Sequence, residues 1–307
     1  MEYCGLRLDQ ALAKLLPDWS RSRLQLWIAE HRITIDNQIP SAKQKVRGGE
    51  QALISPQTIP SSSTYAAEAI DLDIIHEDEA LIVVNKPAGL VTHPGNGNWQ
   101  GTLLNALLHH APQLENIPRA GIVHRLDKDT SGLLVIAKTL AAQTKLVRQL
   151  QQRTVRREYM ALVLGTVQQA GSVNAPIGRH PIHRTKMAIV NTGKMACTNY
   201  KIIEKFEGCT LLYCSLETGR THQIRVHMQS INHPLVGDPI YSGKLPKTDT
   251  TIAHLLINFP RQALHARKLA LIHPQTEQYV LWQANTPADL QYLLDKIRQH
   301  IQHISCI

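Results

Sequence analysis

The chain has 307 residues, 43% of them hydrophobic, which is enough for a sizeable core and argues against wholesale disorder. Lysine and arginine total 33 against 24 acidic residues, so the net charge is +9 and we expect a polyanionic partner. No apolar run approaches the roughly 20 residues that span a bilayer, and no secretory signal is visible. These properties exclude a membrane-spanning protein. We expect a cytoplasmic protein that binds nucleic acid and no membrane.

The cysteines and histidines give little support for a metal site. Five cysteines without framework spacing indicate reduced thiols in a reducing compartment, and no Cys-x-x-Cys pair occurs. His222 and His227 are five residues apart, which misses the spacing of zinc-binding helices, and no Glu follows His222. The sequence also lacks a nucleotide-binding glycine loop. We therefore expect no metal and no nucleotide cofactor.

Residues 6–54 form a compact basic unit. Leucines from Leu8 to Leu16 recur at helical spacing, and a second helix is expected over Arg21–Glu30 with Ser20 as its cap. Short strands are expected at 33–35 and 52–54, with Asn37 in a turn that needs a positive φ. One positive face is expected from Arg21, Arg23, Arg32, Lys43, Lys45 and Arg47. The alternative is an ordinary solvated surface.

This unit resembles an S4-type RNA-binding domain. The resemblance rests on four segments, which are Leu8-Asp9, Ser20-Arg21-Ser22-Arg23, Ile33-Thr34-Ile35-Asp36-Asn37 and Val46-Arg47-Gly48-Gly49-Glu50. The family usually has Asn-Gly at the hairpin, where this chain has Asn37-Gln38. The resemblance implies that the basic residues of this unit contact RNA.

A segment rich in proline, serine and alanine follows, between Pro56 and Ala69, and it has no apolar period. We expect an N-terminal domain over residues 1–58, a linker over 59–70 and a catalytic domain over 71–307. The second domain is rich in strands, expected at 72–76, 80–84, 159–164, 198–203, 210–216, 269–272 and 278–282. Helices are expected at 101–111, at 140–153 and from Pro287 onward. Strands in runs with inserted helices predict an α+β fold on a mixed, largely antiparallel sheet.

Residues 121–132, Gly-Ile-Val-His-Arg-Leu-Asp-Lys-Asp-Thr-Ser-Gly, carry the strongest chemical signal. His124, Arg125, Asp127, Lys128 and Asp129 lie between the apolar entry Ile122-Val123 and the apolar run 133–137. Charged residues between two core-seeking segments are held near the interior, where a carboxylate can be paired and partly desolvated, as a nucleophile must be. The alternative is a turn whose charges are simply solvated.

Three motifs resemble those of RluA-type pseudouridine synthases. They are the segment 121–132, the tripeptide Arg157-Glu158-Tyr159, and the segment 216–227, Leu-Glu-Thr-Gly-Arg-Thr-His-Gln-Ile-Arg-Val-His. The flanking segments Asn85-Lys86-Pro87, His93-Pro94-Gly95 and 233–239 agree as well. The resemblance covers nearly the whole chain and implies the pseudouridine synthase fold.

The resemblance implies an isomerisation in RNA. A uridine loses its N1–C1′ bond, the uracil turns, and C5 is joined to C1′, which requires no redox change or metal. Asp127 matches the catalytic aspartate of the family. Its carboxylate can attack C1′, promote glycal formation or add to the ring at C6, and the sequence does not choose among these routes.

The resemblance also assigns roles to the neighbouring residues. Arg220 is the expected ion-pair partner of Asp127, and the alternative is a surface arginine in a turn. Arg125 is expected against the RNA backbone or in the space left by the flipped base, the alternative being an ion pair with Asp129. Tyr159 is expected to stack on the uracil and help remove the C5 proton, unless it is an ordinary core tyrosine. Further contacts to substrate or RNA are expected from His124, His222, Gln223, Ile224 and Arg225.

The implied partner is 23S rRNA or the assembling large ribosomal subunit, bound by a monomer. A sister synthase with another rRNA or tRNA target is the first alternative. A non-catalytic RNA-binding or assembly factor is the second, although intact Asp127, Tyr159 and Arg220 argue against it. A zinc deaminase would need a His-x-Glu and Cys-x-x-Cys signature, which is absent from the sequence.

Overall fold

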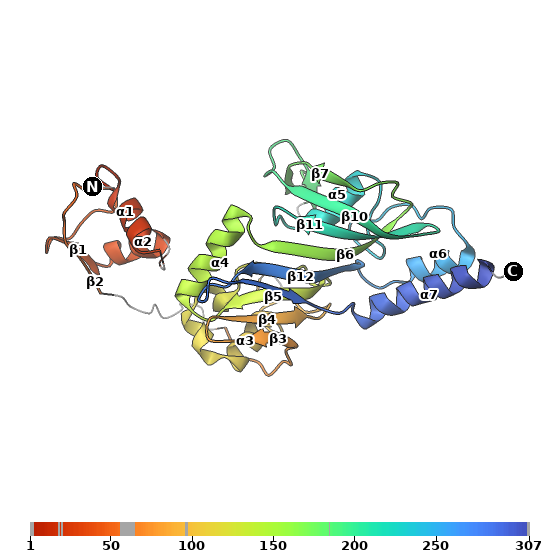
Figure 1. Ribbon diagram of the computed structural model, residues 1–307, viewed down its shortest axis with the longest axis horizontal. Coiled ribbons are helices and arrows are strands. Elements are labelled where there is room, and N and C mark those ends of the chain that lie inside the picture. The colour runs from red at the N-terminus through yellow and green to blue at the C-terminus, as the bar shows by residue number, and fades with distance from the viewer. Residues whose placement is uncertain are drawn as a thin grey trace.

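The N-terminal unit consists of two helices and a two-stranded sheet (Figure 1). The computed structural model describes residues 3–17, 19, 21–55, 65–95, 98–183 and 185–305. Helices α1 (Leu8–Leu15) and α2 (Arg21–Ala29) pack with the antiparallel strands β1 (Ile33–Ile35) and β2 (Ala52–Ile54). Their apolar faces meet around Trp27. These four elements and the positive φ of Asn37 were predicted correctly. The capping residue Ser20 lies outside the described residues.

The second half of the predicted linker, residues 65–70, packs against the catalytic domain. The side-chain amide of Asn105 donates to the carbonyl of Ala66 (2.7 Å), and the Glu68 carboxylate accepts from the Gly101 N–H (3.0 Å). Residues 65–70 therefore pack against the start of helix α3 (Leu103–His110), and the described part of the predicted linker is structured. Residues 56–64 lie outside the described part of the chain.

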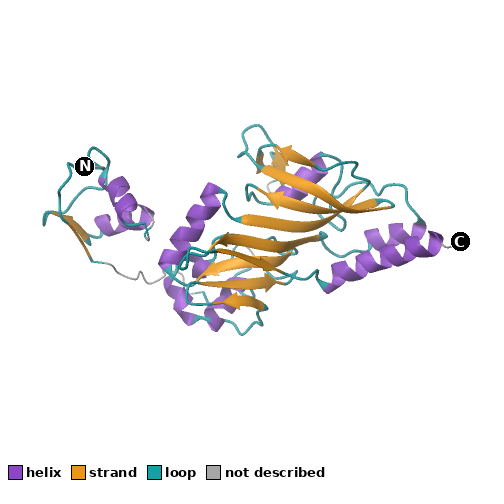
Figure 2. Ribbon diagram, in the orientation of Figure 1, coloured by secondary structure: helices purple, strands orange, loops and turns teal. Residues whose placement is uncertain are grey.

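A nine-stranded sheet forms the centre of the catalytic domain (Figure 2). The strand order is β3-β4-β5-β12-β6-β11-β10-β7, with β13 also paired to β12. The bounds are β3 Ile74–Glu77, β4 Leu81–Lys86, β5 Ser131–Ala137, β6 Arg156–Leu164, β7 Gly171–Asn174, β10 Cys197–Phe206, β11 Cys209–Leu216, β12 Leu264–Ile272 and β13 Tyr279–Gln283. Only the β5–β12 pair is parallel. The predicted α+β class with a largely antiparallel sheet is confirmed.

Helices cover both faces of this sheet. Alternate residues of β4 enter different cores, because successive side chains of a strand point to opposite faces. Ile82 and Val84 join α3 on one face, whereas Leu81 and Val83 join helix α4 (Leu140–Gln152) on the other. Helices α6 (Thr250–Ile257) and α7 (Ala288–Ser305) share a third apolar cluster with β6 and β11. No helix in the described part of the chain is long and apolar enough to cross a membrane.

Several short elements were not predicted from the sequence. They are the 3-10 helices η1 (Pro112–Asn116) and η2 (Pro118–Gly121), the strands β7, β8 (Ile177–Arg179) and β9 (Met187–Ile189), and the helices α5 (Gln223–Ser230) and α6. The strands β8 and β9 form a separate antiparallel hairpin. Helix α5 matters most for function, because it faces the loop that carries Asp127.

Candidate active site

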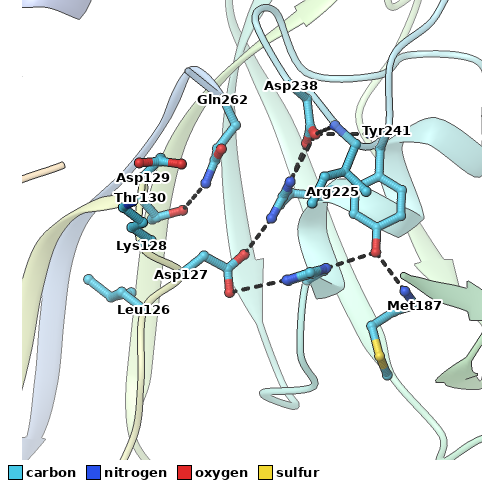
Figure 3. A network of polar contacts seen from close by, with 12 residues as sticks. Leu126, Asp127, Lys128, Asp129, Thr130, Met187, Arg225, Asp238, Tyr241 and Gln262 are labelled. Atoms are coloured by element: carbon cyan, nitrogen blue, oxygen red, sulfur yellow. Dashed lines mark hydrogen bonds and ion pairs between the residues drawn. The ribbon is translucent and has the colours of Figure 1, made fainter. Parts of the chain in front are cut away.

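The loop that carries Asp127 is fixed by contacts from distant parts of the chain. The ammonium group of Lys86, at the end of β4, donates to the carbonyls of Pro87, Leu90 and Lys128 at 2.8–2.9 Å. The Thr92 hydroxyl donates to the Leu126 carbonyl (2.8 Å). On the other side, Arg261 donates to the Asp129 carbonyl, and the Gln262 amide donates to the Thr130 hydroxyl (Figure 3). These contacts hold the backbone on both sides of Asp127.

The Asp127 carboxylate forms an ion pair with Arg225 (Figure 3). Nη1 of Arg225 donates to Oδ2 of Asp127 at 3.0 Å, while Nε and Nη2 donate to both oxygens of Asp238 at 2.7 and 2.9 Å. Burial would lower the pKa of Arg225, but the two carboxylates raise it well above its usual value. Burial likewise opposes ionisation of Asp238, yet Arg225 and two backbone N–H groups lower its pKa. A buried guanidinium thus connects a structural carboxylate to the partly exposed Asp127.

The predicted ion pair between Asp127 and Arg220 is wrong. Arg220 lies in the turn before α5, where its Nε makes one long bond of 3.4 Å to the Met195 carbonyl. Helix α5 starts after His222, and its first turn places Arg225 rather than Arg220 against Asp127. Arg225, predicted to contact RNA, is 3% exposed and donates to two carboxylates. Arg220 still lines the same cleft as Asp127.

His222 faces the other oxygen of Asp127. The Met187 N–H donates to the Tyr241 hydroxyl (2.8 Å), which is left to donate its own proton to Nδ1 of His222 (2.8 Å). The proton of a neutral His222 then lies on Nε2, 3.8 Å from Oδ1 of Asp127. Burial lowers the pKa of His222, although the Asp127 charge opposes this effect. The arrangement supplies a neutral donor beside the Asp127 carboxylate.

Tyr159 lines the same cleft as Asp127, which has a volume of about 1030 Å³. It lies on β6, is 6% exposed and packs in the main core. Burial is the chief cause of its raised pKa, with a smaller contribution from Asp127, so the phenol is neutral at physiological pH. Ile224 lines this cleft too, as predicted. The cleft therefore offers a carboxylate, a neutral phenol and apolar side chains to one ligand.

His124 and Gln223 bond within the protein rather than outward. Nε2 of His124 accepts the Val135 N–H (3.1 Å), and burial lowers the pKa of this imidazole to about 3. The Gln223 oxygen accepts from the Thr218 hydroxyl and the Arg220 N–H, and its amide donates to the Cys197 carbonyl. Gln223 is 3% exposed but lines the cleft, so its contact to RNA stays a prediction, and a contact by His124 is left to Nδ1.

Arg125 is exposed and lines the cleft. The described residues show no ion pair between Arg125 and Asp129, so that alternative is not supported. In the N-terminal unit, Lys43, Lys45 and Arg47 are also exposed, whereas Arg21 pairs with the buried Asp9 (2.7 Å) and Arg32 pairs with Glu30. The RNA contacts of Arg125, His222 and the basic residues of this unit remain predictions.

Two residues that hold the site, Lys86 and Asp238, were quoted in motifs but received no role from the sequence. His222 was predicted to contact substrate or RNA, and its position 3.8 Å from Asp127 was not foreseen. Two signals in the sequence could have indicated these roles. Lys86 is a charged residue at the end of an apolar strand, and Asp238 is a lone carboxylate after the apolar pair Leu235-Val236. Within the described ranges, no group of three or more histidine, cysteine or acidic side chains could hold a metal.

The chain is similar to known RNA-modifying enzymes. Residues 80–230 match the family described as RNA pseudouridylate synthase. Ribosomal large subunit pseudouridine synthase D of Nitrosomonas europaea is 60% identical over 294 residues, which are 96% of this chain and 85% of that protein. The protein of that name from Escherichia coli is 50% identical over 299 residues, 96% and 91% of the two chains.

Among solved structures, human RNA pseudouridylate synthase domain containing 4 is similar, with 27% identity and a TM-score of 0.58. The match covers 73% of this chain and 92% of that one. With relatives 50–60% identical over nearly its full length, the chain belongs to the RluA-type family of RNA pseudouridine synthases. It is an isomerase that converts uridine in RNA to pseudouridine.

Proposed function

We propose that the protein isomerises specific uridines of 23S rRNA in the helix 69 stem-loop, during maturation of the large ribosomal subunit. The relatives named ribosomal large subunit pseudouridine synthase D match nearly the whole chain, the N-terminal unit included. The single observation that carries the chemistry is the Asp127 carboxylate, paired to Arg225 and open to the cleft.

Asp127 acts as the nucleophile in this proposal. Its carboxylate is only partly exposed and forms an ion pair with Arg225, whose guanidinium is held in place by a second, buried carboxylate. The N1–C1′ bond of the uridine breaks, the uracil turns within the cleft, and a C5–C1′ bond forms. The neutral phenol of Tyr159 stacks on the ring and helps to remove the C5 proton, while N1, released from C1′, gains a proton.

The target base has to leave its stack to reach Asp127. Extrusion costs a few kcal/mol in a duplex and less from a loop, so a stem-loop is the favourable substrate. The exposed Lys43, Lys45 and Arg47 of the N-terminal unit bind the phosphates of the surrounding RNA. The basic N-terminal unit thus provides affinity for the RNA, and the cleft, which accepts one flipped nucleotide, selects the target uridine.

The substrate can be tested with the purified full-length protein and two transcripts. One transcript is a 23S rRNA fragment that contains helix 69, and the other is a tRNA anticodon stem-loop. Mapping of pseudouridine after incubation should show conversion of loop uridines in the rRNA fragment and none in the tRNA. Conversion of the tRNA alone would refute the rRNA target and leave the synthase chemistry standing.

A further inference from the structure

Arg157 is a buried cation without a partner. It is 8% exposed, and its Nε is completely buried with no acceptor. Among the residues that the structure describes, no carboxylate or carbonyl bonds to its guanidinium. Two other buried arginines among the described residues of the domain differ, because Arg225 binds Asp127 and Asp238, and Arg261 binds Asp289 and the Asp129 carbonyl.

An unpaired buried guanidinium is costly for the fold. The Nε–H group loses water without gaining an acceptor, and burial of a charge is repaid only by an opposite charge in good geometry. If this position served only packing, the protein would be more stable with an apolar side chain of similar length there. The anion that compensates Arg157 is therefore expected from a ligand.

The guanidinium lies where that ligand binds. Arg157 and Tyr159 are two residues apart on β6, so their side chains share a face and their backbones are about 6.6 Å apart. Both line the cleft that contains Asp127. The chain also makes room for the guanidinium, since a Cβ on Gly219 would lie only 2.6 Å from Nη1 of Arg157.

We propose that Arg157 binds a phosphodiester group of the RNA strand beside the target uridine. The identity of the ligand rests on the proposed function, in which Tyr159 and Asp127 receive the base. A phosphate flanks every nucleoside in RNA, and a planar guanidinium matches its oxygens in a bidentate geometry. The cleft is basic around this point, because Arg119, Arg125, Arg153 and Arg220 line it as well.

The proposal is tested by pairing Arg157→Met with an RNA in which one phosphodiester near the target uridine is a neutral methylphosphonate. The wild-type protein should lose about 10- to 100-fold in affinity when the contacted phosphate is neutralised. Arg157→Met should lose a similar factor on native RNA and then be indifferent to the methylphosphonate at that position. A methylphosphonate in the distant stem should affect both proteins equally.

Two further variants separate this role from a structural one. Arg156→Met changes the exposed neighbour on the same strand and should keep the wild-type response to each methylphosphonate. Gly219→Ala alone should displace the Arg157 guanidinium and weaken RNA binding. Combined with Arg157→Met, it should cause no further loss of affinity. Arg157→Met should also melt at the wild-type temperature or above it, because it removes an unpaired buried charge.

The phosphate contact is refuted if no methylphosphonate near the target weakens binding by the wild-type protein more than binding by Arg157→Met. It is also refuted if Arg157→Met only lowers the melting temperature. The proposed function is judged separately, by whether the wild-type protein converts uridine in the same native RNA. Conversion without coupling would refute the phosphate contact alone, and coupling without conversion would refute the proposed function alone.

Discussion

At the scale of single residues, the site depends on a shared arginine. Arg225 forms ion pairs with both the buried Asp238 and the partly exposed Asp127. Asp238 also accepts the backbone N–H groups of Ile240 and Tyr241, so the pair is anchored before Asp127 joins it. The fold therefore holds the positive charge at Asp127 in a fixed position.

Arg225→Met should destabilise the protein by roughly 3–5 kcal/mol, because it leaves Asp238 buried without its cation, and it should abolish turnover. Urea unfolding and pseudouridine mapping measure the two effects. Arg225→Met/Asp238→Asn should regain most of the stability but no activity. Arg220→Met is the matched control and should change stability by no more than about 0.5 kcal/mol. A larger loss from Arg220→Met than from Arg225→Met would contradict this assignment.

Buried histidines also make the fold sensitive to acid. Burial lowers the pKa of His124 to about 3 and that of His265 to about 4. The unfolded chain binds protons at these residues near pH 6.5, whereas the folded chain does not. Their stabilising contribution is thus complete above pH 6.5 and is lost as pH falls.

Between pH 6.5 and 5, stability should fall by about 1.4 kcal/mol per pH unit for each of these histidines. Lys86, whose pKa burial lowers to about 7, is already protonated in both states in this range and adds little. Urea unfolding at pH 7, 6 and 5 measures the slope, which should be shallower in His265→Asn. A flat profile across this range would show that these imidazoles are not buried in the neutral form.

At the scale of elements, the close contact of β5 and β12 positions the Asp127 loop. Gly132, the second residue of β5, has a φ of 117°, and a Cβ there would lie 2.3 Å from the Ala266 carbonyl oxygen. The parallel pairing of Ser131 and Gly132 with β12 thus requires glycine at this position. Because β5 follows the loop directly, its register also sets the position of Asp127.

Gly132→Ala should cost more than about 4 kcal/mol, since neither the backbone conformation nor the carbonyl can yield cheaply. Soluble expression and thermal unfolding provide the readout. Gly95→Ala is the control, because its φ is not positive and nothing lies within 4 Å of the added Cβ. Equal melting temperatures for the two variants would disprove the steric requirement.

Much of this element structure was predictable from the sequence. The strands β4, β10 and β11 and the helix α4 are long enough for their periodicity to be read directly. Helix α5 was missed because the segment around Gln223 and Arg225 is polar by sequence, and its polar groups are buried by partners from distant segments. The resemblance to RluA-type synthases had assigned Arg220 as the partner of Asp127. Only the left-handed turn at His222 and the start of α5 determine which arginine faces the carboxylate.

At the scale of the whole molecule, affinity and chemistry are assigned to different parts of the chain. The N-terminal unit has its own small core around Trp27, and its Lys43, Lys45 and Arg47 are exposed. The cleft, by contrast, is formed entirely by residues 91–264 of the catalytic domain. We therefore expect the N-terminal unit to target the enzyme without forming part of the active site.

Deletion of residues 1–60 should leave the catalytic domain folded while weakening its binding to large-subunit rRNA. Each lost phosphate contact should reduce the slope of log affinity against log salt by about 0.7–0.9. Filter binding at several salt concentrations gives the slope, and circular dichroism reports folding. An unchanged slope would show that the basic residues of this unit do not contact RNA.

The most direct test of the central claim is the activity of Asp127→Asn on the 23S rRNA fragment. This change keeps the size and polarity of the side chain and removes only the nucleophilic charge. Pseudouridine formation should fall by at least about a thousandfold, while the melting temperature and the affinity for the RNA stay close to those of the wild type. Turnover within tenfold of the wild type would contradict the assignment of Asp127 as the nucleophile.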